Sequence, residues 1–314
     1  MPETTSVTAP GFYDLTPAQY HADPAPKPSL NSGVAAKLLT ETPKTAWFSH
    51  PRLNPEFQEQ DEKKFDLGSV AHELLLGKGA GIEVLDFPNW TTKAAKEARA
   101  EAVANGLQPC LVDLYEKAQA MVAAARVQLG DDPENFDAFT NGRGEVAVLW
   151  QEQTAPGKMW MRGQLDWFMD DQQRIYDYKT FAPGADPENF IKYLVRGGKD
   201  IQDPFYSRGV ASVLDVDWEA ITFRFVVQHP EPPFLLSVVE IESQGRQWSY
   251  DRSQWAIDKW ADCAVKQQYR GFVPRTHHVG IPTWSQMEWE DRRRADELAE
   301  QMLAQAAEQL EAAE

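Results

Sequence analysis

Three adjacent segments between residues 145 and 181 alternate apolar and polar side chains and are joined by short turns. The segments contain EVAVLWQEQ, MWMRGQLDWFM and RIYDYKTF, and the turns contain TAPGK and DDQQ. Alternation with a period of two is typical of β-strands, and connections this short join antiparallel neighbours. The pattern therefore constrains the chain to contain an antiparallel meander of three strands.

Helical patterns flank the meander on both sides. An N-cap at Asn31 and Ser32 begins the first predicted helix. Apolar residues at helical spacing predict helices over 33–39, 44–49, 66–77, 91–105, 111–129, 187–214 and 248–270, and further strands are predicted over 219–229 and 234–242. This order predicts an α/β (α+β) fold with a central mixed β-sheet flanked by helices.

The sequence pattern divides the chain into three parts. Residues 1–30 are rich in Pro, Thr and Ala and are expected to form an irregular lead-in, and residues 31–284 are expected to form one domain. Residues 285–314 predict a C-terminal helix with its apolar residues on one stripe. We interpret this helix first as docked on its own domain, and second as a coiled-coil-like contact between chains.

Composition excludes several classes of protein. With 314 residues, the chain can bury a large core without disulfides or a structural metal. It contains no apolar run of about 18 residues, which excludes a membrane-spanning helix, and its start predicts no secretory signal. The cysteines, Cys110 and Cys263, form no CxxC pair, so a disulfide framework, a zinc finger and an iron–sulfur cluster are excluded.

The net charge of −17 opposes binding to nucleic acid, because phosphate recognition depends on Lys and Arg. Net charge does not describe the local field in a cleft, however, so the positions of the basic residues matter. Basic residues gather after the meander, and the start of the first predicted helix offers a second candidate for phosphate binding. The candidate DNA-binding residues in these two places are Lys192, Arg196, Lys199 and Arg208, and Ser32 and Lys37.

Three charged residues of the meander point to metal chemistry. Asp177 and Lys179 are two residues apart on one predicted strand and therefore share a face, and the short turn brings Asp166 beside Asp177. Carboxylates are hard ligands that suit Mg²⁺ or Mn²⁺. A bound ion lowers the pKa of water, and a lysine offsets charge on a phosphoryl group. The alternative is a charged, solvated strand face.

The spacing of these motifs resembles a known family. GQLDW, YDYKT and QDPFY occur in that order, and GSVAH precedes them on a predicted helix. In this they resemble the PD-(D/E)XK nuclease superfamily, in its RecB-like branch. The surrounding sequence, over about residues 12–272, is similar to phage and prophage RecE-type exodeoxyribonucleases of the exonuclease VIII kind. The resemblance implies a restriction-endonuclease-like core.

The resemblance implies a role for each motif residue. Asp166 and Asp177 would be the principal metal ligands, and the backbone carbonyl of Tyr178 would add a further one. His72 would ligate the metal or orient its water, and Lys179 would assist the attacking water. Without the resemblance, a histidine on a leucine-rich helix is more often a core residue.

Three further residues complete the implied site. Glu145 resembles the acidic residue that several branch members place near the metals. Gln202 and Tyr206, one helical turn apart, would hold the DNA strand or buttress the site. Surface exposure for Glu145 and core packing for Gln202 and Tyr206 are the alternatives.

The resemblance implies a Mg²⁺-dependent exodeoxyribonuclease that digests linear duplex DNA from 5′ ends and leaves 3′ single strands for phage-type recombination. It implies two ions per site, with Mn²⁺ able to substitute, a ring-shaped trimer or tetramer, a single-strand annealing protein as partner, and a place in the cytoplasm of a bacterial cell. An endonuclease or a nuclease of single-stranded ends is one alternative. A catalytically silent scaffold and an unrelated metal module are others.

Overall fold

A computed structural model describes residues 7–57 and 66–311 of the chain. Its contacts divide the chain into two units, Met1–Gly271 and Phe272–Glu314. The first unit holds the sheet and the candidate site. The second contains helix α10 (Thr283–Glu311), at the position of the predicted C-terminal helix. None of the described helices is long and apolar enough to span a membrane.

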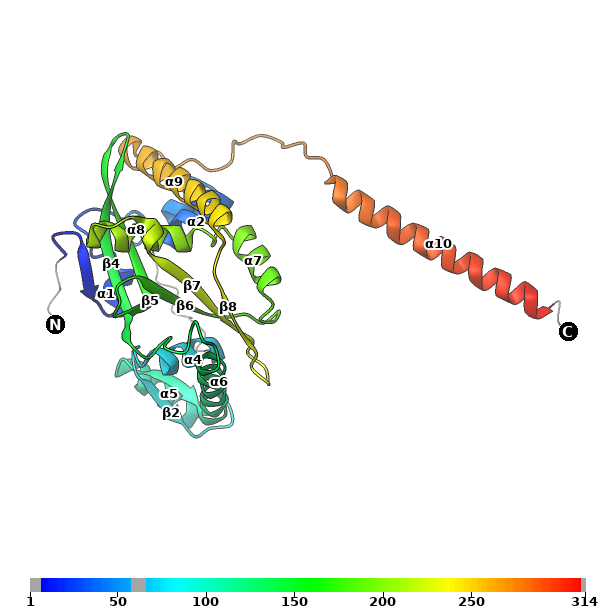
Figure 1. Ribbon diagram of the computed structural model, residues 1–314, viewed down its shortest axis with the longest axis horizontal. Helices are drawn as coiled ribbons and strands as arrows, with labels where there is room; N and C mark the ends of the chain where they lie inside the picture. The colour runs from blue at the N-terminus through cyan, green and yellow to red at the C-terminus, as the bar shows by residue number, and fades with distance from the viewer. Residues whose placement is uncertain (1–6, 58–65, 312–314) are drawn as a thin grey trace. The chain divides into compact units, whose positions relative to one another are not determined.

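The first unit is built on a six-stranded mixed sheet (Figure 1). In spatial order its strands are β1 (Gly11–Asp14), β4 (Gly142–Thr154), β5 (Gly157–Met169), β6 (Arg174–Thr180), β7 (Thr222–Gln228) and β8 (Leu236–Val239). All neighbours are antiparallel except β6 and β7, which run parallel and are connected through two helices. The predicted mixed α/β fold with a central sheet is therefore confirmed, and so is the meander.

Helices form at the positions that the sequence predicts, with ends shifted by a few residues, except that the helix predicted over 187–214 is interrupted at residues 197–201 and forms two helices. They are α2 (Ser32–Thr40), α3 (Pro43–Phe48), α4 (Leu67–Leu76), α5 (Lys93–Ala104), α6 (Val112–Gly130), α7 (Pro187–Arg196), α8 (Gln202–Leu214) and α9 (Ser243–Lys266). The side chain of Asn31 caps α2 by accepting from the Val34 amide, as its N-cap pattern predicts.

Four short elements were not predicted. Strand β1 and helix α1 (Pro17–His21) lie in the segment expected to be irregular, and β1 pairs with β4 at the sheet edge. Strands β2 (Ile82–Leu85) and β3 (Gln108–Leu111) form a separate parallel pair. Each spans only four or five residues, which is too few to establish a period in the sequence.

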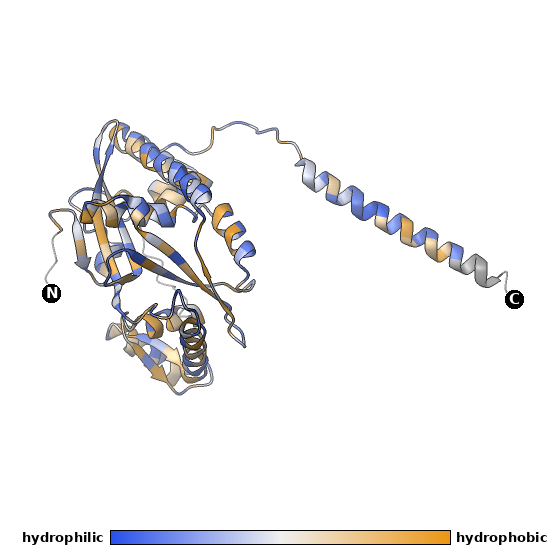
Figure 2. Ribbon diagram, in the orientation of Figure 1, coloured by the Kyte–Doolittle hydropathy of each residue, from blue (hydrophilic) through white to orange (hydrophobic). Residues whose placement is uncertain are grey.

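The two faces of the sheet belong to different hydrophobic clusters. On β6, Ile175 joins a cluster with α2, α7, α8 and α9, whereas Tyr176 and Tyr178 join one with α4 and α6. Figure 2 shows orange and blue residues mixed along the strands of the sheet, and much of α9 blue. Close packing against the sheet depends on Gly209 of α8, where a Cβ would lie 2.7 Å from the Trp150 ring. The candidate residues lie where these clusters meet.

Candidate active site

Three acidic residues lie in one row across three neighbouring strands. The pairs Gly144–Trp167 and Val146–Leu165 place Glu145 of β4 opposite Asp166 of β5. The last β5–β6 pair, Trp167–Tyr176, makes Asp177 of β6 the next residue in the same row. Strand register therefore brings together carboxylates that are up to 32 positions apart in the sequence.

The backbone is distorted along this row. Glu145 has a positive φ of 50°, which is uncommon for a residue with a side chain. The alternation of faces along β5 also changes here, because Leu165 and Phe168 join the same cluster while Trp167 joins the other. The β5–β6 ladder ends at this row. Distortion of this kind re-aims side chains and is frequent next to active sites.

The carboxylate of Asp166 is held by contacts from three directions. Its Oδ2 accepts a hydrogen bond of 2.8 Å from the Tyr178 amide. His72 Nε2 of α4 lies 3.4 Å from the same oxygen, and Lys179 Nζ lies 3.9 Å from it. The other ring nitrogen of His72, Nδ1, is 3.9 Å from Glu145 Oε1. His72 thus bridges two members of the acidic row.

Asp177 is almost completely buried, with 1% of its surface exposed. Its Oδ2 contacts the Lys179 ammonium, and its Oδ1 accepts a hydrogen bond from the Gln202 amide of α8. No hydrogen bond from another described residue reaches Oδ2. The carboxylate is therefore fixed by one cation and one amide, and its buried Oδ2 has the Lys179 ammonium as its partner.

The charges of the site are strongly coupled. Burial raises the pKa of Asp177 to about 7, against the opposing effect of Lys179. Burial also acts to raise the pKa of Asp166, but Lys179 and His72 outweigh it and lower that pKa to about 2. For His72 and Lys179, burial acts to lower the pKa, but the carboxylates outweigh it, so both pKa values are raised. The carboxylates of the row are therefore balanced by the cations of Lys179 and His72, which contact them directly.

Tyr206 packs between α2 and β5, next to the acidic row. Its ring is buried and lies against Gly163, where a Cβ would come within 2.8 Å of the ring. Its hydroxyl accepts a hydrogen bond of 3.0 Å from Ser32 Oγ. Gly163 is the first residue of GQLDW, three residues before Asp166. A side chain at this position would collide with Tyr206, which explains the glycine. Tyr206 joins α2, β5 and α8 rather than facing solvent.

The donor set fits a divalent cation of the Mg²⁺ class. The row offers carboxylate oxygens, and His72 adds a ring nitrogen beside them. Among the residues that the structure describes, no group of three His, Cys, Asp or Glu side chains is arranged so that it could hold a metal ion. Mg²⁺ does not require one, because it binds through one or two carboxylates together with waters and substrate phosphate. Asp177 Oδ2 contacts a positive charge in this structure, the ammonium of Lys179.

A cleft of about 410 Å³ opens beside Lys179 and Gln202. Ser32 and Lys37 of α2 line it, as does Lys199 from the segment between α7 and α8. The first turn of α2 thus lines the same cleft as Lys179 and Gln202, which contact Asp177. Of the residues predicted to bind phosphate, Ser32, Lys37 and Lys199 line this one cleft.

The other predicted basic residues are not gathered there. Arg208 donates hydrogen bonds of 3.0 and 2.9 Å to Glu152, and it stacks on the Tyr250 ring at 4.6 Å. Lys192 is exposed on α7 with Glu188 3.9 Å away, and Arg196 is exposed at the end of that helix. Arg208 therefore serves an internal ion pair, while Lys192 and Arg196 remain on the surface.

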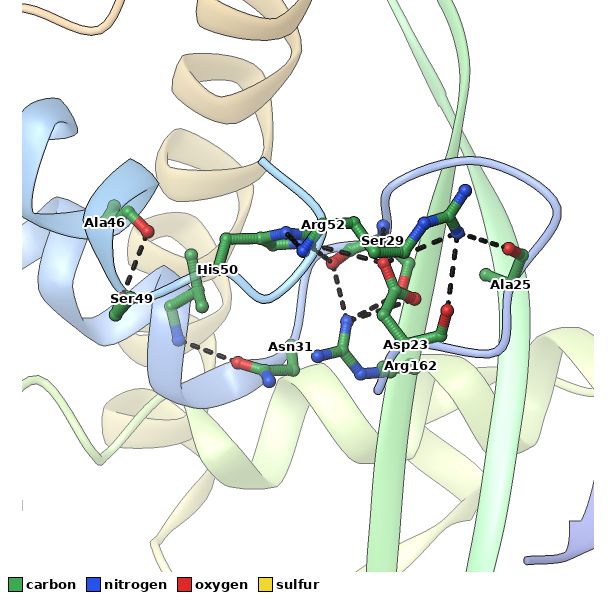
Figure 3. A network of polar contacts seen from close by, with 10 residues as sticks. Asp23, Ala25, Ser29, Asn31, Ala46, Ser49, His50, Arg52 and Arg162 are labelled. Carbon is green, nitrogen blue, oxygen red and sulfur yellow. Dashed lines mark hydrogen bonds and ion pairs between the residues drawn. The ribbon is translucent and has the colours of Figure 1, made fainter. Parts of the chain in front are cut away.

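A buried polar network, which the sequence did not reveal, holds the segment before α2 (Figure 3). Arg162 of β5 donates two hydrogen bonds of 2.8 Å to Ser29 and lies 3.3 Å from Asp23. Asp23 accepts from the Ser29 amide and hydroxyl, and His50 Nε2 lies 3.0 Å from the Ser29 carbonyl. The network fixes the residue next to Leu30, which pairs with β5, and so positions the start of α2.

Comparison with known proteins finds similar folds among solved structures. No family model and no curated protein matches the chain. A crystal structure named "Putative exonuclease" from Eubacterium rectale aligns with a TM-score of 0.56 and 13% identity, covering 86% of this chain and 97% of that one. The structure of SSO0001 aligns with a TM-score of 0.26 and 10% identity, over 60% and 84% of the chains. The chain shares the fold of the first protein.

Proposed function

We propose that the chain is a metal-dependent deoxyribonuclease that hydrolyses phosphodiester bonds from the ends of linear duplex DNA. The observation that carries the proposal is the meeting of Asp166, Asp177 and Lys179 beside a cleft lined by Lys179 and Gln202. The shared fold with a protein named as an exonuclease supports it. The direction, 5′ to 3′, rests on the resemblance to RecE-type enzymes.

The chain's own residues would position the reacting groups. Asp166 and Asp177 would hold one or two Mg²⁺ or Mn²⁺ ions, with His72, Glu145 and the Tyr178 carbonyl as further ligands. When bound, the metal supplies Lewis acidity toward the scissile phosphate and lowers the pKa of water.

Lys179 would act next to the metal ligands. Its ammonium would orient the attacking water and offset the charge that develops on the phosphoryl oxygens, and Gln202 would keep Asp177 in place. Water adds to phosphorus as the bond to the 3′ oxygen breaks. The cleft residues Ser32, Lys37 and Lys199 would bind the phosphate backbone, with Lys192 and Arg196 extending the contact at the surface.

We further propose that the protein acts as a ring-shaped trimer or tetramer in the cytoplasm of a bacterial cell, with a single-strand annealing protein as its partner. A ring would place basic residues toward the channel and acidic residues toward solvent, which reconciles a net charge of −17 with DNA binding. Light scattering tests the assembly, since a monomer in solution would remove this explanation of the acidic surface.

The deciding experiment uses linear duplex DNA labelled at either end, with and without Mg²⁺, beside a covalently closed circle. We expect Mg²⁺-dependent release of the 5′ label and an intact circle, and no release by the Asp177→Ala variant. Nicking of the circle would identify an endonuclease instead. Binding of DNA ends without hydrolysis in any divalent metal would identify a silent scaffold.

A further inference from the structure

The solvent side of α9 carries a stripe in which tryptophans and cations alternate. Trp248, Arg252, Trp255 and Lys259 follow one another at spacings of four, three and four residues, so they lie on one face of the helix. The Arg252 guanidinium lies 4.5 Å from the centre of the Trp248 ring, and Lys259 Nζ lies 5.9 Å from that of Trp255. We call these four residues the α9 stripe.

The α9 stripe is not needed to pack the helix. Ala256, Ile257 and Trp260, on the other side of α9, are buried against the core cluster that includes α2 and α8. The Trp248 and Trp255 side chains, by contrast, are 49% and 52% exposed. Two large aromatic rings thus face solvent in a helix that is already anchored by its opposite face.

The stripe is linked to the cleft beside the acidic row. Arg252 donates a hydrogen bond of 2.7 Å to Asp200, and Ser249 donates one of 2.9 Å to the same carboxylate. Asp200 follows Lys199, which lines the cleft together with Lys179. The first half of the stripe is therefore tied to the segment that forms one wall of the cleft.

Of the two cations of the stripe, Arg252 is in an ion pair of 2.7 Å with the buried Asp200. Within the described residues, no ion pair engages Lys259. Lys259 also lines a small cavity of about 160 Å³ with Lys266 and Arg270, and there Lys266 forms an ion pair of 2.5 Å with Asp262. The acidic neighbours Asp251 and Asp258 lie on the adjacent face, where they accept hydrogen bonds from glutamines of α9.

We propose that the α9 stripe binds single-stranded DNA, with bases stacked on Trp248 and Trp255 and the phosphate backbone beside Lys259, while Arg252 holds the Trp248 ring in place. Single-stranded nucleic acid is bound in general by aromatic side chains on which the bases stack, next to cations that contact the phosphates. The proposal rests on the proposed nuclease function, because the strand that it would bind is the one left after its complement has been digested.

The test measures binding of a short labelled oligo(dT) to the full-length Asp177→Asn variant without divalent metal. Relative to that background, Trp255→Ala should weaken binding about tenfold, and Lys259→Gln should lower the salt slope by about 0.7, as expected for one phosphate contact on a single strand. Trp255→Phe should retain most of the affinity because it keeps an aromatic face. The matched control is Trp289→Ala, which removes a tryptophan of α10 that is 64% exposed.

Unchanged affinity in Trp255→Ala, or an equal loss in Trp289→Ala, would overturn the proposal. Failure of the nuclease proposal is read separately, from cleavage of linear duplex by the unmodified chain with Mg²⁺. A stripe-dependent loss of oligo(dT) binding in a chain without nuclease activity would leave the binding site standing and remove the enzyme. If the unmodified chain cleaves linear duplex but the stripe variants bind oligo(dT) normally, the nuclease proposal stands and the binding site on α9 is removed.

Discussion

The amide of Tyr178 and the carboxylate of Asp166 form a hydrogen bond of 2.8 Å at the position where strands β5 and β6 stop pairing. A side-chain oxygen thus takes the place of the backbone carbonyl that would continue the ladder. This contact ties Asp166 to the strand that carries Asp177 and Lys179. The three charged groups are therefore held by the sheet itself.

Lys179→Ala should lower kcat about 100-fold and change the affinity for DNA by less than about threefold. The reason is that Lys179 contacts both carboxylates and would act on charge that develops only during the reaction. Single-turnover hydrolysis together with DNA binding in Ca²⁺ would separate the two effects. An equal loss in binding and turnover would mean that Lys179 is a simple phosphate anchor.

Reversing Arg196 and Lys199 to Glu should weaken DNA binding and lower its salt slope by about 2, as expected if each contacts one phosphate. Both side chains are exposed, and Lys199 lines the cleft. Binding is measured over a series of salt concentrations in the absence of divalent metal. The control reverses Lys158 and Arg292, which are also exposed, and retains the slope. A slope unchanged by the first pair would rule out these contacts.

Gly163→Ala should destabilise the fold by about 1–3 kcal/mol and reduce nuclease activity, because the added methyl group meets the ring of Tyr206. Urea denaturation gives the free energy of unfolding. Gly130→Ala is the matched control, since nothing lies within 4 Å of its added Cβ. If Gly163→Ala were as stable as Gly130→Ala, Tyr206 would not be tightly packed against β5.

His50 should make the protein less stable in acid. Burial, with Arg162 and Arg52 nearby, lowers the pKa of His50 to about 4, whereas an unfolded chain has a histidine pKa of about 6.5. Between these values the unfolded state binds the proton and the native state does not, so stability falls as pH decreases from about 6.5 to 4. The loss should reach up to about 3 kcal/mol.

The effect of His50 is isolated by comparing chains at each pH, because other buried groups also titrate. Burial raises the pKa of Asp203 to about 6, which acts in the opposite direction over part of the range. The free energy of unfolding of the His50→Gln variant should therefore approach that of the unmodified chain as pH falls to 4. The exposed His278→Gln serves as control. A difference that stays constant with pH would show that the pKa of His50 is the same in the native and unfolded states, which contradicts the prediction.

Much of the fold was predictable because its long elements have clear periods. The meander follows from alternation in β4, β5 and β6, and the positions of Asp177 and Lys179 on one face follow from their spacing of two. Glu145 also belongs to the acidic row, and counting the register outward from the β4–β5 turn could have placed it opposite Asp166.

The remaining features depend on contacts between distant segments. Nothing in the sequence around Arg208 reveals that its guanidinium donates hydrogen bonds to Glu152. The contacts of Arg162 with Asp23 and Ser29 are equally hidden in the sequence. Such pairings are set by how helices and loops pack on the sheet, and local patterns do not encode them. The change of face along β5 at Asp166 is likewise a product of the assembled sheet.

The connection between β5 and β6 spans only residues 170–173, and its length decides which residue faces Asp166 across the gap. Removing or adding a single residue there would put a tyrosine, Tyr176 or Tyr178, opposite Asp166 and turn Asp177 toward the α4 side of the sheet. This loop therefore works as a spacer of fixed length, and changes in its length should be far more damaging than changes in its composition.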